Sequence, residues 1–145
     1  MKKIITLSIL SLLLISCAST KQYKKFTATD QISQDKARIY LIRTGNFGGF
    51  IKFDVYQNTK DNLIGAVGPK SYLCFDSPIG ENKIIVKAES EKIYTINAVA
   101  GKTYYLRLVP KMGVNKARVN FELLSNEEGI KEARKLKSPK MYYTE

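Results

Sequence analysis

The strongest constraint on the fold is an alternation of apolar and polar residues that runs in short segments from Ala37 to Leu124. Such a period of two is typical of half-buried β-strands, because successive side chains of a strand point to opposite faces. About eight segments occur between turn-forming residues, and no helical segment separates them. The pattern predicts an all-β domain of about seven to eight strands over residues 37–124, either a single antiparallel β-sandwich or a barrel. The clearest segment aligns four apolar residues on one face: Ala117, Val119, Phe121 and Leu123.

Residues 45–49 form a glycine-rich segment, Gly-Asn-Phe-Gly-Gly, directly after the first predicted strand. Glycine-rich loops that bind phosphate lead into a helix N-terminus and usually carry a Lys-Ser or Lys-Thr pair. This segment leads into a second predicted strand instead. We therefore interpret it as a hairpin turn.

One helix is predicted after the last strand, within a C-terminal helix and basic tail over residues 125–145. Ser125 can cap its N-terminus, and Glu128, three residues later, completes a capping box. Basic residues gather toward the C-terminal end, where the helix dipole favours cations. This basic surface is a candidate contact for anionic lipid or for a partner, through four residues: Lys131, Arg134, Lys135 and Lys137.

The N-terminus has the layout of an export signal. Two lysines precede an apolar run over residues 4–15, which is shorter than the roughly 20 residues needed to span a bilayer. The run ends in Leu14-Ile15-Ser16-Cys17, which resembles the bacterial lipobox. That resemblance implies a signal peptide over residues 1–16, cleavage between Ser16 and Cys17, and lipid attached to the Cys17 thiol. The alternative is an ordinary secretory signal that happens to end near a cysteine.

Lipid on Cys17 would make membrane lipid the first partner of the protein, because two or three acyl chains attach almost permanently. Residues 17–36 are polar and are interpreted as a lipidated tether. Ala18 follows the cysteine, whereas an aspartate there favours inner-membrane retention in enteric bacteria. We therefore expect an exported, lipid-anchored protein, in the outer membrane if the cell has one.

Composition limits the chemistry further. Removal of residues 1–16 takes away two lysines and no acid, so the formal net charge falls from +11 to +9. That surplus favours an anionic partner, such as an envelope protein with an acidic face or an anionic cell-wall polymer, and it is equally typical of the ordinary surface of a lysine-rich protein. Nucleic acid is not expected in an exported compartment. The chain has no histidine, the usual general base and transition-metal ligand. We therefore expect no catalytic residue, no metal site and no cofactor.

The remaining candidates each have a simpler structural interpretation. Tyr105 and Arg107 could form an exposed pair that binds a sugar or a peptide, but core packing and cross-strand pairing explain them better. Cys74 lies between apolar neighbours and is interpreted as a buried small hydrophobe. Carboxylates are scattered over strands and turns and are interpreted as surface charge: Asp54, Asp61, Asp76, Glu81, Glu89, Glu91 and Glu122.

Four segments of the chain form a recognisable set: ARIYLIR at 37–43, LIG at 63–65, AGKTYYLR at 100–107 and the Glu-Glu-Gly segment at 127–129. Together they resemble the DUF2846 family of bacterial domains of unknown function. The family's Pro-Gly turn before its central strand differs here, where residues 78–82 read Pro-Ile-Gly-Glu-Asn. The resemblance implies a prealbumin-like β-sandwich that often carries a lipoprotein signal, and it transfers no catalytic residue.

These inferences predict a membrane-anchored envelope lipoprotein that acts as a non-catalytic binding or structural module. Partner contact would use its exposed faces, its edge strands or its surface charge. Two alternatives remain from other classes, namely a carrier of small ligands and a carboxylate-based hydrolase of the envelope.

Overall fold

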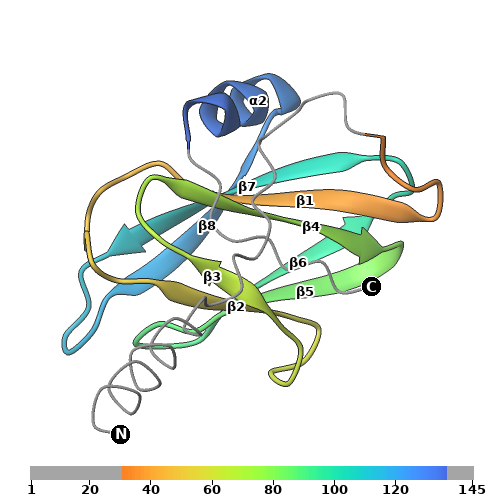
Figure 1. Ribbon diagram of the computed structural model, residues 1–145. Coiled ribbons are helices and arrows are strands. Elements are labelled where there is room, and N and C mark those ends of the chain that lie inside the picture. Colours follow the sequence, from red (N-terminus) through yellow and green to blue (C-terminus); the bar gives the residue numbers. More distant parts are fainter. Residues whose placement is uncertain (1–30, 137–145) are drawn as a thin grey trace, which may run out of the picture.

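Eight strands and one helix make up most of residues 31–136, the part of the chain that the computed structural model describes (Figure 1). The all-β prediction is confirmed, and the eight strands lie within residues 36–124, close to the predicted range of 37–124. The strands are β1 (Lys36–Arg43), β2 (Phe53–Gln57), β3 (Leu63–Val67), β4 (Ser71–Pro78), β5 (Gly80–Val86), β6 (Lys92–Ala98), β7 (Thr103–Lys111) and β8 (Arg118–Leu124), and helix α2 (Asn126–Lys135) follows them.

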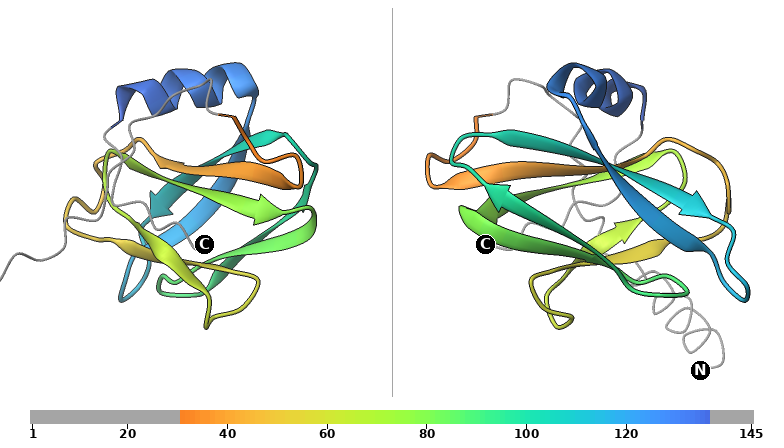
Figure 2. Two further views of the ribbon diagram at one scale, coloured as in Figure 1. Left: turned by 45° about the vertical axis from the view of Figure 1, so that its right-hand side comes forward. Right: turned by 180° about the vertical axis from the view of Figure 1, so that it is seen from behind.

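Two four-stranded sheets face each other, with strand orders β4-β1-β7-β8 and β3-β2-β5-β6 (Figure 2). Neighbouring strands are antiparallel with one exception, because β1 and β7 pair in parallel and align Ile39 with Tyr104 and Leu41 with Leu106. The prediction of a purely antiparallel sandwich is therefore wrong for this pair. Strand periodicity reports which residues share a face, but it carries no information on the direction of a partner strand.

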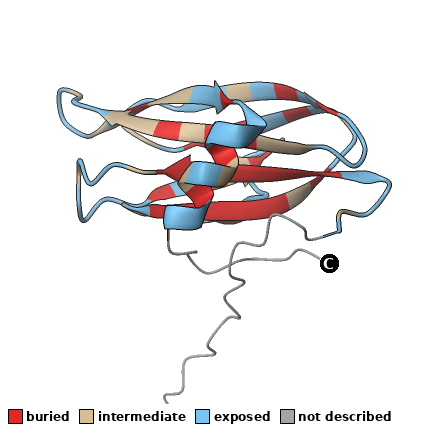
Figure 3. Ribbon diagram, turned by 90° about the horizontal axis from the view of Figure 1, so that it is seen from above, coloured by how far each residue is buried: buried red, intermediate tan, exposed pale blue. Residues whose placement is uncertain are grey.

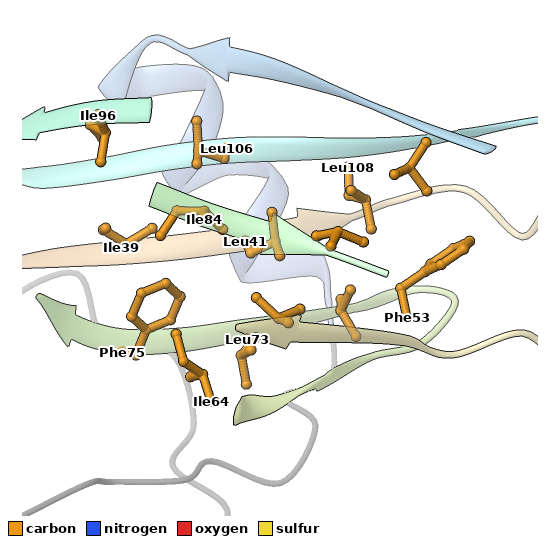
Figure 4. Close-up of a cluster of buried hydrophobic side chains, with 14 residues drawn as sticks. Ile39, Leu41, Phe53, Ile64, Leu73, Phe75, Ile84, Ile96, Leu106 and Leu108 are labelled. Atoms are coloured by element: carbon orange, nitrogen blue, oxygen red, sulfur yellow. The ribbon is translucent and has the colours of Figure 1, made fainter. Parts of the chain in front are cut away.

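The main hydrophobic core lies between the two sheets (Figure 4). It takes alternate residues from each strand, such as Ile39 and Leu41 of β1, and this explains the period of two. The last strand departs from the prediction at its end. Leu123 shares the face of Val119 but is 54% exposed, whereas Leu124, on the opposite face, is buried.

Helix α2 covers the outer face of the β4-β1-β7-β8 sheet (Figure 3). A second apolar cluster lies beneath it, with Tyr40 and Ile42 of β1 facing Ala133. Because β1 is covered on both faces, residues 37–43 are all buried, which explains their nearly continuous apolar character. The predicted capping box is confirmed: Ser125 Oγ accepts from Glu128 N, and the Glu128 carboxylate accepts from Ser125 N. Within residues 31–136, no helix has the length and apolarity to cross a bilayer.

Residues 44–52 connect β1 of one sheet to β2 of the other, so they form a crossing loop. The prediction of a hairpin turn at residues 45–49 is wrong, because β1 and β2 belong to different sheets. The chain returns to the first sheet between β3 and β4, and it crosses to the second sheet again between Pro78 and Gly80, where only Ile79 separates β4 from β5. Gly80 has a φ of 95°, a left-handed value that glycine adopts without the steric cost of a Cβ atom.

Candidate functional site

Tyr105 is 3% exposed and lies beneath helix α2. Its ring stacks on Tyr40, with 5.1 Å between the ring centroids and 12° between the planes. Gly129 of α2 sits directly on this ring, because a Cβ built there would overlap Tyr105. The suggestion of an exposed Tyr105–Arg107 pair is therefore wrong, and the preferred interpretation of Tyr105 as a packing residue is confirmed.

The buried tyrosines under α2 are held in their neutral form. Removal from water raises the pKa of Tyr105, and the nearby Cys74 adds to this effect. Burial likewise raises the pKa of Tyr40 well above its ordinary range, again with a contribution from Cys74. Cys74 itself is buried, as expected. A neutral phenol at this depth is a poor base and a poor nucleophile, so the cluster contributes packing rather than acid–base chemistry.

Arg107 remains near the surface, on the strand face that α2 partly covers. Its Nη1 donates a 2.9 Å hydrogen bond to Glu122 Oε2 of the neighbouring β8 strand. Arg107 Nε is buried and has no hydrogen-bond partner within residues 31–136. The interaction of Arg107 with Glu122 is therefore a cross-strand ion pair, of the kind that stabilises sheets.

A groove of about 590 Å³ runs between the start of α2 and the adjoining ends of β7 and β8. We call it the α2 groove. Apolar side chains of Leu123 and Ile130 line it together with the polar groups of Lys102, Ser125 and Asn126. Tyr104, also in its wall, is held by its hydroxyl, which donates to Asn97 O and accepts from Val99 N. The groove mixes apolar surface with a few polar groups, as ligand sites commonly do.

Comparison with known proteins places this architecture in a family. Residues 33–120, more than half of the chain, match the family described as "Protein of unknown function (DUF2846)". The chain belongs to this family. The matched DUF2846 region runs from just before β1 into β8, and it includes residues 101–105, which line part of the α2 groove. Helix α2 lies beyond it.

An uncharacterised protein of Haemophilus influenzae is similar to this DUF2846 chain, with 32% identity over 132 residues. The alignment covers 87% of this chain and 77% of the relative. No solved structure matches the chain.

The predicted basic surface of this DUF2846 protein is present on α2 in part. Lys131, Arg134 and Lys135 are exposed on the helix, and Lys135 lies 3.6 Å from Glu132 in an ion pair one turn away. These three residues lie on the exposed side of the helix, whereas Gly129 and Ala133 are buried against the sheet. Lys137 lies outside the described residues, as do Ser16 and Cys17.

Most of the scattered carboxylates, which were interpreted from the sequence as surface charge, form ion pairs with basic side chains. Asp76 accepts two hydrogen bonds from Arg38, and Glu91 pairs with Lys60. Glu122 pairs with Arg107. Within residues 31–136, no group of three or more acidic, histidine or cysteine side chains could hold a metal ion.

Sequence reasoning missed the role of Arg43, which is fully buried at the end of β1. Its guanidinium donates to three backbone carbonyls of the crossing loop, with distances of 2.5 Å to Ile51 O, 2.7 Å to Phe47 O and 3.0 Å to Gly48 O. It also lies 4.9 Å from the centroid of the Phe53 ring. The available signal was a basic residue that ends an apolar strand immediately before a glycine-rich loop.

Glu89 clamps a second loop in a similar way. Its carboxylate accepts hydrogen bonds from the backbone N–H groups of Val114 and Asn115 and from Arg118 Nε. The Asn115 N–H lowers the pKa of Glu89 most, and Arg118 and the Val114 N–H lower it further. Sequence reasoning had assigned Glu89 only to scattered surface charge, since its partners lie more than 20 residues away along the chain.

Proposed function

We propose that this protein is an exported bacterial lipoprotein, anchored through lipid on Cys17, and that its sandwich domain binds a partner in the cell envelope without catalysing a reaction. The observation that carries this proposal is the segment Leu14-Ile15-Ser16-Cys17 after a short basic and apolar N-terminus. The first strand begins at Lys36, so a segment of about 20 residues separates the cysteine from the domain. Such a polar tether has a typical reach of roughly 25 Å, enough to clear the lipid headgroups.

A non-catalytic role is supported by how the reactive side chains are used. Acids that could act in pairs are bound to arginine or lysine instead, as with Asp76 on Arg38 and Glu122 on Arg107. The tyrosines near the α2 groove are buried and neutral or tied to backbone groups. The chain also lacks histidine throughout. These features favour recognition over acid–base chemistry.

The α2 groove is the surface we propose for the partner. The groove offers exposed apolar surface at Leu123. Two exposed cations, Lys131 and Arg134, belong to helix α2, which also forms one wall of the groove. This combination suits an anionic partner with some apolar surface, such as an acidic envelope protein or a cell-wall polymer. The lipid anchor would hold the groove on the exported side, in the outer membrane if the cell has one.

Lipid attachment is tested by labelling cells with radioactive palmitate and by mass spectrometry of the purified protein. The expected result is label on the parent, none on Cys17→Ala, and a mass that shows acyl chains at residue 17. Cys74→Ala is the matched control, because it removes the second cysteine of the chain and should keep the label. Equal labelling of the parent and Cys17→Ala would refute the anchor.

Partner binding is tested by crosslinking in membranes and recovery of the protein with its crosslinked neighbours. Leu123→Glu places a charge in the α2 groove and should abolish a specific crosslinked species. Ile93→Glu is the control, because Ile93 has a similar exposure on an edge strand of the opposite sheet. Loss of the species in both variants, or in neither, would argue against the groove.

A small-ligand carrier is the second candidate, because about 590 Å³ lies within the range of roughly 300–1,000 Å³ found for ligand pockets. A bound small molecule would appear in native mass spectrometry of the purified protein. It should be present on the parent and on Ile93→Glu and absent from Leu123→Glu.

A further inference from the structure

Two loops with unusual surfaces lie at one end of the sandwich. One is the crossing loop, residues 44–52, and the other is residues 112–117, which join β7 to β8. Figure 1 and the right-hand view of Figure 2 both place the two loops at the same end of the domain. Ile51 and Lys52 of the first loop and Asn115 and Lys116 of the second line one cavity of about 420 Å³. We call these two loops together the loop tip.

The loop tip exposes large apolar side chains to water. Phe50 is 104% exposed, Val114 82% and Met112 81%, and Phe47 and Ile51 are also exposed. Half of the large exposed hydrophobic side chains within residues 31–136 lie on these two short loops. Isolated exposed apolar residues are normal on protein surfaces, but a concentration of them at one site marks an interaction surface.

Both loops are held in place by buried or clamped charges rather than by their own side chains. Arg43 anchors the first loop through three carbonyl groups, and Glu89 anchors the second through two backbone N–H groups. The backbone is therefore secured from the inside, while side chains such as Phe50 and Met112 point outward. Securing a loop in this way lowers the entropy lost when its side chains become buried.

The apolar side chains are bordered by lysines. Lys52, Lys87 and Lys116 line the shared cavity, and Lys111 ends β7 directly before Met112. Asp54 is the one acid in the lining of that cavity. The carboxylate of Glu89 is already occupied by Arg118 and by backbone N–H groups. The border of the loop tip is thus cationic.

We propose that the loop tip inserts into the headgroup region of an anionic lipid bilayer. The aromatic and aliphatic side chains of the loop tip enter the membrane–water interface, while the bordering lysines remain at the level of the anionic headgroups. A lipid surface accounts for the apolar centre and the cationic border together. The insertion rests on the described loops alone, and it would give the domain a second membrane contact besides any lipid on Cys17.

The absence of tryptophan from the chain allows a site-specific test. Phe50→Trp places a single indole on the loop tip, and Ile79→Trp places one at the opposite end, where Ile79 is also exposed. Each full-length protein is mixed with phosphatidylcholine vesicles that contain about 30% phosphatidylglycerol. We expect the emission of Phe50→Trp to shift to the blue and to be quenched by brominated lipid, with no change for Ile79→Trp. Any contribution of the N-terminal segment is common to both proteins.

The charge requirement is tested in the Phe50→Trp background. Lys52→Gln with Lys116→Gln should lower the affinity for vesicles, followed by the emission shift, about 25-fold, because each lysine near an anionic surface contributes about fivefold. Lys36→Gln with Lys102→Gln is the matched control, since both lysines are exposed at the opposite end. Raising the salt concentration should weaken binding of the parent for the same reason.

Two results would overturn the proposal. The first is an indole at position 50 that stays in water on every vesicle, and the second is an equal response at positions 50 and 79. If the first result is accompanied by crosslinks from position 50 to a specific protein, the loop tip is a protein-binding surface instead. The mass of each sample shows independently whether Cys17 carries lipid, so a failure of anchoring is distinguished from a failure of insertion.

Discussion

Replacing Gly129 with alanine should loosen helix α2 from the sheet, although alanine is the better helix former. A Cβ built on Gly129 would lie 2.5 Å from Cδ2 of Tyr105 and still closer to the Cβ and Cγ atoms of that residue. Real Cβ atoms essentially never approach a neighbour within 3.0 Å. Because Cβ of Tyr105 is fixed by the β7 backbone, no change of rotamer can relieve the overlap. The helix must therefore move outward, by roughly 1 Å or more.

The expected change in the free energy of unfolding on Gly129→Ala combines two opposing effects. Overpacking of this kind costs about 1–3 kcal/mol, and the rigid position of Tyr105 Cβ places this case at the upper end. Exchange of glycine for alanine within a helix gains about 1 kcal/mol. We therefore expect Gly129→Ala to lower the free energy of unfolding by about 2 kcal/mol. The tyrosines under α2 should also become more accessible to solvent.

Urea unfolding followed by circular dichroism measures the change, and near-ultraviolet circular dichroism reports the packing of Tyr40 and Tyr105. Lys131→Ala is the control, because Lys131 is exposed on the same helix and should change stability by less than about 0.5 kcal/mol. Gly129→Ala combined with Tyr105→Ala should not recover stability, since the Cβ of residue 105 remains. A Gly129→Ala protein as stable as the parent would refute the close approach of α2 to β7.

Three further predictions concern the caps and clamps of the described domain. Ser125→Ala removes the N-cap of α2 and should cost about 1 kcal/mol in urea unfolding, whereas Ser90→Ala, in an exposed turn, should cost almost nothing. Glu89→Gln should destabilise the protein at neutral pH, where the parent carries the stabilising carboxylate. The difference in stability between parent and variant should shrink below pH 4.5, the ordinary carboxyl pKa, and vanish once the pH falls below the lowered pKa of Glu89, because the parent is then protonated as well. Arg43→Lys keeps the charge but loses the planar fork, so it should speed amide hydrogen exchange in residues 44–52, and unchanged exchange would argue against the clamp.

Much of the fold followed from local patterns. The alternation around Ile39 and Leu41 identified strands and their inward faces, because side-chain direction in a strand depends only on position along it. The capping box at Ser125 and Glu128 located the start of α2 for the same kind of reason, since its hydrogen bonds join residues three apart. The limits of the all-β domain, residues 37–124, could also be predicted.

The candidate site could not be predicted in the same way. Tyr105 and Arg107 occupy equivalent alternating positions, but Tyr105 is buried because α2 folds back over it. Sequence periodicity shows that two residues share a face and does not show what covers that face. The close approach of α2 depends on Gly129, whose neighbour Tyr105 is 24 positions away along the chain.

The amino-acid sequence alone therefore determined the strands, the helix, the family resemblance and the N-terminal segment on which the proposed anchor depends. The tertiary structure decided the parallel pairing of β1 with β7, the covering of Tyr105, and the meeting of the two loops secured by Arg43 and Glu89. The physical reason is the range of the interactions. Backbone geometry and capping act over a few residues, whereas strand partners and buried clamps join residues that meet only when the whole chain has folded.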